Sequence, residues 1–162
     1  MHFVAVGKVL VLVAVANGSP IIATRIFGTV FSGPLDGNVR FIDGRPLFGP
    51  SKTIRGIIVS LPTTALIAPL LGLELRLGLL IGATAMAGDL LSSFLKRRLS
   101  LPPSSRATGL DQIPESLLPL LASGPALSLS AIDIVLGCLV FFFGELLLSN
   151  LFFKLRLRNR PY

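Results

Sequence analysis

The sequence predicts an all-α polytopic membrane protein with about five transmembrane helices. Hydrophobic residues make up 52% of its 162 residues and charged residues only 14%, and the mean hydropathy is +0.80. Average proteins contain about 25% charged residues, so this composition favours the membrane class. The apolar segments are each close to the ~20 residues that a helix needs to cross a bilayer. Residues 1–162 are therefore interpreted as a single integral membrane domain.

Five apolar segments are predicted to form the spans. They cover residues 3–22, 55–73, 76–95, 113–128 and 132–153. The fourth segment is the weakest, because it is short and contains Pro114, Pro119 and Pro125. Proline removes a helical hydrogen bond, so a re-entrant or broken helix is an alternative for this segment.

Basic residues cluster in three regions, and five spans place all three on one side of the membrane. The regions are the loop after the first span (Arg25, Arg40, Arg45, Lys52 and Arg55), the loop after the third (Lys96, Arg97, Arg98 and Arg106) and the tail (Lys154, Arg156, Arg158 and Arg160). Because cytoplasmic loops are enriched in lysine and arginine, we expect the N-terminus outside and these regions in the cytoplasm. A large cytoplasmic loop, residues 23–55, then joins the first two spans.

Asp89 is the first candidate site residue, because it lies inside an otherwise apolar helix. A carboxylate at membrane depth costs several kcal/mol unless it is paired, solvated or metal-bound, so it is a functional candidate. Ser93 and Lys96 share its helix face, and Arg97 and Arg98 follow directly. A metal ligand and a cluster of cations on one helix suit phosphate chemistry at a bilayer face. The structural alternative is that Asp89 pairs with Lys96 or Arg97.

The glycine-rich loop is the second candidate. Its motifs are Pro34–Gly37, which contains Asp36, and Asp43–Arg55, which contains Lys52 and Thr53. Glycines let backbone amides approach a phosphate, and lysine and arginine supply charge and donors. The segment Gly44–Gly49 resembles part of a Walker A loop, but the spacing to the lysine is wrong and no strand precedes it, which excludes an ATPase of that class. The alternative is a basic loop that contacts anionic headgroups.

Asp111 is the third candidate. In the five-span topology it lies just before the fourth span, on the same side as the end of the third, so Asp89 and Asp111 are expected to converge. Two carboxylates near many cations suggest Mg²⁺ shared with substrate phosphates. The alternative is that Asp111 caps the following helix, with Glu115 in its first turn. Glu145, in the fifth span, either lines the site or pairs elsewhere.

Together these residues resemble the CDP-archaeol synthase family, membrane enzymes related to phosphatidate cytidylyltransferases, and the chain looks like a bacterial relative. The motifs that carry the resemblance are Ala16–Asn17, Pro20, Pro34–Gly37, Asp43–Gly44, Gly49–Gly56, Gly88–Asp89, Ser93–Arg98 and Leu110–Gln112. One position departs from the family pattern: a second aspartate is expected shortly after Gln112, and Glu115 stands there instead, displaced by one position.

The resemblance implies an Mg²⁺-dependent reaction of CTP with a membrane lipid phosphate, giving a CDP-activated lipid and pyrophosphate for phospholipid biosynthesis. It assigns catalytic roles to Asp89, Asp111, Lys96 and Lys52, with Asp89 and Asp111 as metal ligands. The predicted substrate-binding residues are Asn17, Asp36, Asp43, Lys52, Thr53, Arg55, Ser93, Arg97 and Arg98.

We expect an integral protein of the bacterial inner membrane whose active site faces the cytoplasm. The expected partners are CTP, the lipid phosphate and the bilayer, with no nucleic acid, and a homodimer is an alternative to a single copy of the chain. The alternative function is a small transporter or scaffold that uses Asp89 and Glu145 as relay or packing charges.

Overall fold

The computed structural model describes residues 2–28, 30–102, 105 and 107–154, with residues 148–154 as helical backbone only. Its elements are α1 (Phe3–Phe27), α2 (Ile54–Ile67), the short 3₁₀ helix η1 (Ala68–Leu71), α3 (Leu75–Arg98), α4 (Gln112–Leu127) and α5 (Ala131–Lys154). In the described part of the chain, the only β-type pairings are two isolated bridges within the loop that precedes α2. The predicted all-α class is therefore confirmed. Arg106 and the basic residues after Lys154 lie outside the described residues.

The helices coincide with the five predicted apolar segments. Within the described residues, three of them, α1, α2 with η1, and α3, are long and apolar enough to cross a membrane. Helix α4 has only 16 residues, about 24 Å at 1.5 Å per residue. It continues through Pro119 and Pro125, so the broken-helix alternative is wrong. That the chain crosses the membrane five times stays a prediction.

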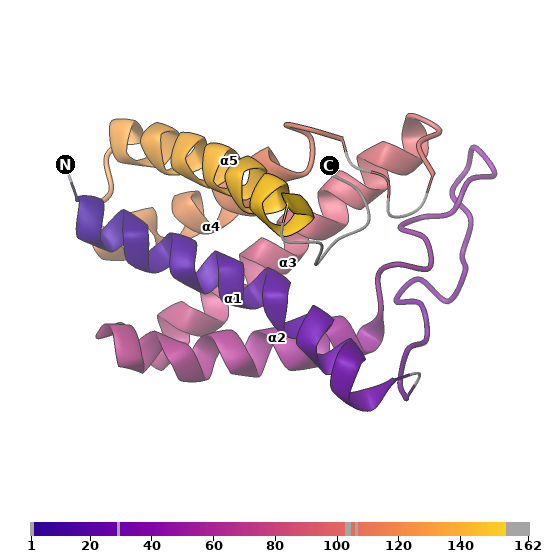
Figure 1. Ribbon diagram of the computed structural model, residues 1–162, viewed down its shortest axis with the longest axis horizontal. Coiled ribbons are helices and arrows are strands. Elements are labelled where there is room, and N and C mark those ends of the chain that lie inside the picture. The colour runs from indigo at the N-terminus through magenta and orange to yellow at the C-terminus, as the bar shows by residue number, and fades with distance from the viewer. Residues whose placement is uncertain (1, 29, 103–104, 106, 155–162) are drawn as a thin grey trace.

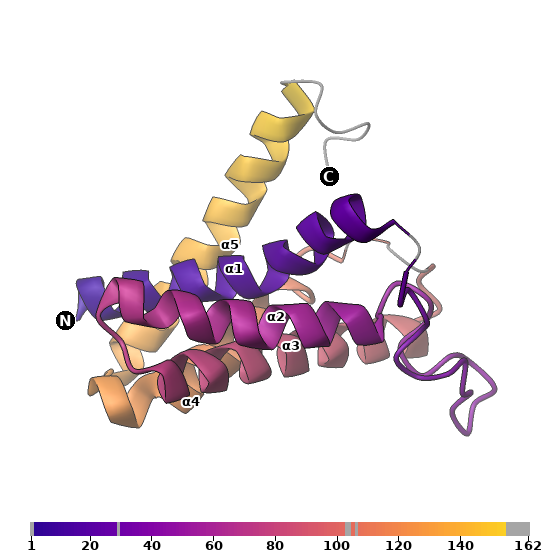
Figure 2. The ribbon, with the colours of Figure 1, turned by 90° about the horizontal axis from the view of Figure 1, so that it is seen from below.

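Successive helices run in opposite directions, so the segments that connect them lie at two ends of the bundle. Figure 1 shows the glycine-rich loop and the C-terminal end of α3 at one end, and the N-terminus and the turn after α2 at the other. In Figure 2, α5 leans away from α1, α2 and α3 toward its C-terminal end. Two of the basic regions predicted for the cytoplasm thus lie at the same end of the molecule.

The core lies where α1, α3 and α4 meet. Its fully buried apolar side chains include Val9, Leu12, Val13, Ile81, Ala85 and Leu120. Small hydroxyl side chains also lie in the interior. One of them, Ser60 on α2, donates a hydrogen bond of 2.9 Å to the backbone carbonyl of Ala16 on α1. Small residues let transmembrane helices approach one another closely, which is the usual basis of packing in a bilayer.

Gly88 marks the closest approach of α3 and α4. A Cβ atom added there would lie 2.8 Å from Glu115 Cα and would also clash with the backbone carbonyl of Pro114. Only glycine fits at this position, because the atoms in its way belong to backbone and not to flexible side chains. The neighbouring Asp89 and the first turn of α4 are thereby held against each other.

Replacing Gly88 with alanine is expected to separate α3 from α4 and to destabilise the protein by about 1–3 kcal/mol, the usual cost of overpacking. Thermal unfolding in detergent measures this change. Gly7→Ala is the matched control, because no atom lies within 4 Å of a Cβ at that exposed helical position. Equal unfolding temperatures for the two variants would contradict the close approach.

Candidate active site

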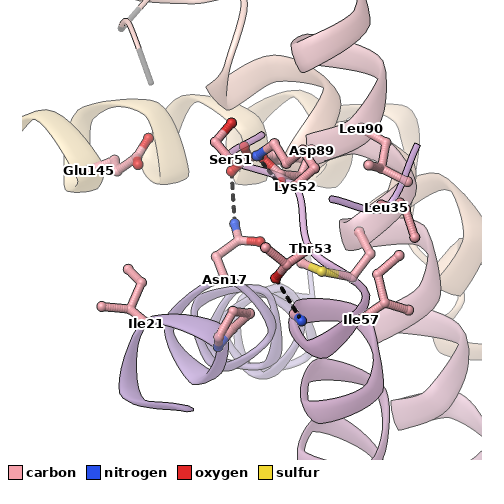
Figure 3. A pocket seen from close by; sticks show the side chains of 14 residues that line it. Asn17, Ile21, Leu35, Ser51, Lys52, Thr53, Ile57, Asp89, Leu90 and Glu145 are labelled. Atoms are coloured by element: carbon pink, nitrogen blue, oxygen red, sulfur yellow. Dashed lines mark hydrogen bonds and ion pairs between the residues drawn. The ribbon is translucent and has the colours of Figure 1, made fainter. Parts of the chain in front are cut away.

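Two adjoining cavities lie where the glycine-rich loop meets the helix bundle. The first has a volume of about 290 Å³ and the second about 350 Å³, and both are lined by Lys52, Asp89, Glu115 and Glu145. Asn17 and Thr53 also line the first, whereas Ser93, Lys96, Arg97 and Asp111 line the second. In Figure 3, Glu145 approaches the first cavity from α5, on the opposite side from Leu35 and Leu90. The structure therefore brings eight of the predicted site residues together: Asn17, Lys52, Thr53, Asp89, Ser93, Lys96, Arg97 and Asp111.

The centre of the site is an ion pair between Lys52 and Asp89. Lys52 Nζ lies 2.5 Å from each carboxylate oxygen of Asp89. Both side chains are partly exposed to the cavity, 20% for Lys52 and 24% for Asp89. The structural alternative, in which Asp89 pairs with Lys96 or Arg97 of its own helix, is wrong. The loop instead brings its lysine across to the carboxylate at membrane depth, where an unpaired charge would be costly.

Two further carboxylates surround this pair. Glu115 accepts a hydrogen bond of 2.8 Å from Asn17 Nδ2 and lies close enough to Asp89 for the two carboxyl groups to interact. Glu145 Oε2 is buried and has no hydrogen-bond partner. The sequence showed both as acidic residues in apolar segments, but it did not assign them to the site. Their position identifies them as site residues that the sequence analysis left open.

A second ion pair joins Lys96 to Asp111, with 2.7 Å between Lys96 Nζ and Asp111 Oδ1. Asp111 also accepts a hydrogen bond of 3.1 Å from the backbone N–H of Ala107. It occupies the N-cap position of α4, but its side chain accepts no capping hydrogen bond there. The capping alternative is therefore wrong, whereas the expected convergence is observed, because Asp89 and Asp111 line the same cavity.

Asp36 organises the glycine-rich loop from within. Its carboxylate accepts hydrogen bonds of 2.9 Å from the backbone N–H groups of Phe48 and Gly49, and one of 3.0 Å from Asn38. Desolvation acts to raise the pKa of Asp36, but the backbone donors together outweigh it and hold the pKa below its ordinary value of 3.8. Asp36 does not line either cavity. In the structure Asp36 therefore orders the loop, and its predicted contact with substrate stays a prediction.

Replacing Asp36 with asparagine should speed amide hydrogen exchange across residues 36–49, because one charged acceptor of three backbone donors is lost. Since the folded pKa lies below 3.8, the carboxylate stabilises the loop at neutral pH, and this contribution is lost as the pH falls through the folded pKa. Glu74→Gln is the matched control for exchange at Phe48 and Gly49, because Glu74 is an exposed carboxylate outside the loop and makes no capping hydrogen bond. Unchanged exchange at these two amides in Asp36→Asn would contradict the assignment.

Three other predicted substrate-binding residues also lie away from the two cavities. Arg55 is buried and donates to Thr24 Oγ1 and to the backbone carbonyls of Gly28 and Val30, so its guanidinium holds the end of α1. Asp43 and Arg98 form an ion pair of 2.6 Å at the tip of the loop. That these residues contact substrate stays a prediction.

The carboxylates at the cavities suit a metal that is shared with substrate. Across the described residues, no group of three or more histidine, cysteine, aspartate or glutamate side chains is placed to hold a metal ion. Mg²⁺ is commonly bound through one or two carboxylates plus substrate phosphates, with water completing its shell. Asp89 and the unpartnered Glu145 oxygen fit such a shared site, and Asp111 lines the cavity next to it.

Comparison with known proteins identifies the family. A family model described as CarS-like CDP-archaeol synthase matches residues 72–162. The CDP-archaeol synthase of Hyperthermus butylicus is 37% identical over 135 residues, which cover 75% of this chain and 77% of that protein. The chain belongs to the CDP-archaeol synthase family. A second family member, from Sulfurisphaera tokodaii, is 33% identical over 156 residues and covers 91% of this chain and 89% of its own.

Other matches agree with membership of the CDP-archaeol synthase family. The synthase of Pyrococcus furiosus is 41% identical over 107 residues, and this match spans 60% of the length of each protein. A solved structure described as an intramembrane enzyme for archaeal membrane lipid biosynthesis has a TM-score of 0.75 and 27% identity, covering 88% of this chain and 90% of that one. These matches confirm the predicted resemblance to the CDP-archaeol synthase family. They also confirm that the protein is an integral membrane protein. The relatives named here are archaeal, so they do not support a bacterial inner membrane.

Proposed function

We propose that this protein is a CTP-dependent cytidylyltransferase that converts a membrane lipid phosphate to a CDP-activated lipid and releases pyrophosphate. The observation that carries the proposal is the Lys52–Asp89 pair, set among further carboxylates and cations, in a member of a family of CDP-archaeol synthases. The transporter or scaffold alternative is not favoured, because the named relatives are synthases.

The proposed reaction is an in-line displacement that needs no covalent enzyme intermediate. An oxygen of the lipid phosphate attacks the α-phosphorus of CTP, and the bond from that phosphorus to the oxygen bridging the β-phosphate breaks. Pyrophosphate carries away the electron pair. Catalysis of this kind depends on positioning and on neutralising phosphate charge, which matches a cavity lined by Lys52, Lys96 and Arg97.

Asp89 is proposed to hold Mg²⁺, with Asp111 or Glu145 contributing from the same cavity. When bound, Mg²⁺ supplies positive charge and orients the phosphates. Lys52 then exchanges its contact with Asp89 for a contact with the nucleotide phosphates. Lys52 thus compensates Asp89 in the free protein and becomes available for the triphosphate when substrate arrives.

The lipid substrate and the orientation of the site complete the proposal. Because the relatives are named for a CDP-archaeol product, a diether isoprenoid lipid phosphate is the first substrate to test. We propose that the site faces the cytoplasm, where CTP is available, because basic residues surround it and cytoplasmic loops are enriched in lysine and arginine.

The test uses purified full-length protein in detergent with Mg²⁺, one labelled nucleotide at a time (CTP, UTP, ATP or GTP) and either a diether or a diacyl lipid phosphate. CDP-lipid formed from CTP alone supports the proposal, and the better lipid identifies the substrate class. A folded, monodisperse protein that makes no product from either lipid would overturn it.

A further inference from the structure

Arg98, the last residue of α3, fastens the tip of the glycine-rich loop to the helix bundle. Its Nη1 donates a hydrogen bond of 2.6 Å to Asp43 Oδ1, and its Nη2 donates to the backbone carbonyls of Pro46, at 2.6 Å, and Arg45, at 3.4 Å. The guanidinium therefore binds three acceptors on one short stretch of loop. Its side chain is 19% exposed.

Two aromatic rings enclose the same guanidinium. Arg98 Cζ lies 4.8 Å from the ring centre of Phe41 on the loop and 4.9 Å from that of Phe94 on α3. The two rings meet edge to face, with their centres 5.3 Å apart. Arginine suits such a site because its planar group can stack on rings while its edge donates hydrogen bonds, which a lysine ammonium cannot do.

The loop also binds back to the helix. Arg45 Nη1 donates to the backbone carbonyls of Arg98 and Arg97 in the last turn of α3. Carbonyls at a helix C-terminus lack partners within the helix, and a cation there interacts favourably with the helix dipole. The side chain of each arginine thus binds the backbone of the other, and we call this reciprocal arrangement of Arg45, Arg98 and Asp43 the loop latch.

The loop latch lies next to the residues that line the site. One residue before Arg98, the Arg97 side chain lies about 3.8 Å from the point that a Cβ at Gly49 would occupy. Three residues after Gly49, Lys52 reaches Asp89 on the same helix α3. Because α3 carries both the latch and Asp89, the latch sets the position of the loop relative to the cavity.

We propose that Arg98 is a positioning residue that holds the glycine-rich loop, with Lys52, over the active site and does not itself bind phosphate. This role replaces the substrate contact expected for Arg98 from the sequence. Both terminal nitrogens of its guanidinium donate to protein acceptors, two rings enclose the group, and Arg98 lines neither of the two cavities. The part of the proposal that concerns catalysis rests on the proposed function.

Loss of the latch should weaken nucleotide binding more than the chemical step. When only a fraction of molecules hold the loop in place, the apparent affinity falls by that fraction, whereas the bound complex still reacts. We expect Arg98→Ala to raise KM for CTP about 10-fold and to change kcat less than about 3-fold. A group that neutralised charge in the transition state would instead lower kcat by about 10²-fold or more.

The decisive comparison is between Arg98→Ala, Arg98→Lys, Asp43→Ala and the double variant Arg98→Ala/Asp43→Ala. A positioning role predicts that lysine rescues little and that the two alanine effects on KM are not additive, because both remove the same latch. Restoration of the wild-type KM by lysine, or additive effects, would assign Arg98 to substrate and overturn the proposal. Arg76→Ala is the matched control, an exposed arginine at the opposite end of α3.

A second readout is independent of the reaction. Trypsin cleavage after Arg40 and Arg45 in the intact protein should be about 10-fold faster in Arg98→Ala than in Arg76→Ala, because the tip of the loop is released. Equal cleavage rates would overturn the latch itself. If Arg98→Ala is cleaved faster but the wild-type protein makes no CDP-lipid, the loop latch is supported and the proposed function is wrong. Failure of the latch and failure of the proposed function are therefore distinguishable.

Discussion

Replacing Lys52 with alanine is expected to lower kcat/KM for CTP by about 10²–10³-fold, the effect of removing one preorganised group that stabilises developing charge. Lys52 is the loop residue whose ammonium reaches the carboxylate in the cavity, at 2.5 Å. In the proposed reaction the same ammonium turns to the triphosphate. The measurement is the steady-state rate of CDP-lipid formation at several CTP concentrations.

Two controls separate catalysis from folding for Lys52. Lys8→Ala removes a lysine at the opposite end of the bundle, near Gly72, and should retain wild-type kinetics. Lys52→Met combined with Asp89→Asn removes both charges of the pair, so that Asp89 does not remain as a carboxylate without its lysine at membrane depth. This double variant should elute from a size-exclusion column as a folded protein and still be inactive. Activity above about one tenth of wild type in folded Lys52→Ala would contradict a direct role for the lysine.

Replacing Asp89 with asparagine is expected to lower turnover by about 10³-fold or more, because the change removes both the proposed metal ligand and the partner of Lys52. Asparagine keeps the shape of the side chain, so the effect reports on charge. Mn²⁺ binding, followed by electron paramagnetic resonance in the presence of CTP, should weaken in parallel. This second measurement does not depend on turnover.

The matched control for Asp89 is Glu74→Gln. Glu74 is an exposed carboxylate at the start of α3, and its side chain makes no capping hydrogen bond. Its neutralisation should leave both turnover and Mn²⁺ binding unchanged. If Asp89→Asn bound Mn²⁺ as tightly as wild type in the presence of CTP, Asp89 would not be a metal ligand.

The helices were predictable because one strong physical signal determines them. Each apolar segment is close to the length of a span, and the structure places a helix over each, from Phe3–Phe27 to Ala131–Lys154. What hydropathy could not show is where a helix changes form. The second segment passes from α2 to η1 at Ala68 and ends at Gly72, whose φ of +69° is in the left-handed region that favours glycine.

The site was predictable in its residue types but not in its pairings. Asp89 was recognisable because a carboxylate within an apolar helix needs a partner. Its partner Lys52 lies 37 residues away on a loop, and helix periodicity relates only residues that are close in sequence. The alternative that the sequence offered, a cation on the same helix, was therefore wrong.

The roles of arginine were the hardest to predict. The family resemblance implied that Arg55 and Arg98 bind substrate. In the structure their guanidinium groups bind backbone carbonyls of the protein, at Gly28, Val30, Arg45 and Pro46. Every residue carries such a carbonyl, so sequence alone does not show which of them a folded loop presents to an arginine.

The most direct test of the central claim follows the two ends of CTP separately. Purified protein, Mg²⁺ and the lipid phosphate are incubated with CTP labelled at either the α- or the γ-phosphorus. Attack at the α-phosphorus predicts that the α label appears in the lipid fraction and the γ label in pyrophosphate, one for one. Transfer of the γ label to lipid would show a kinase reaction, and release of the γ label as inorganic phosphate without labelled lipid would show simple hydrolysis. Either result would contradict the account of this protein as a lipid cytidylyltransferase.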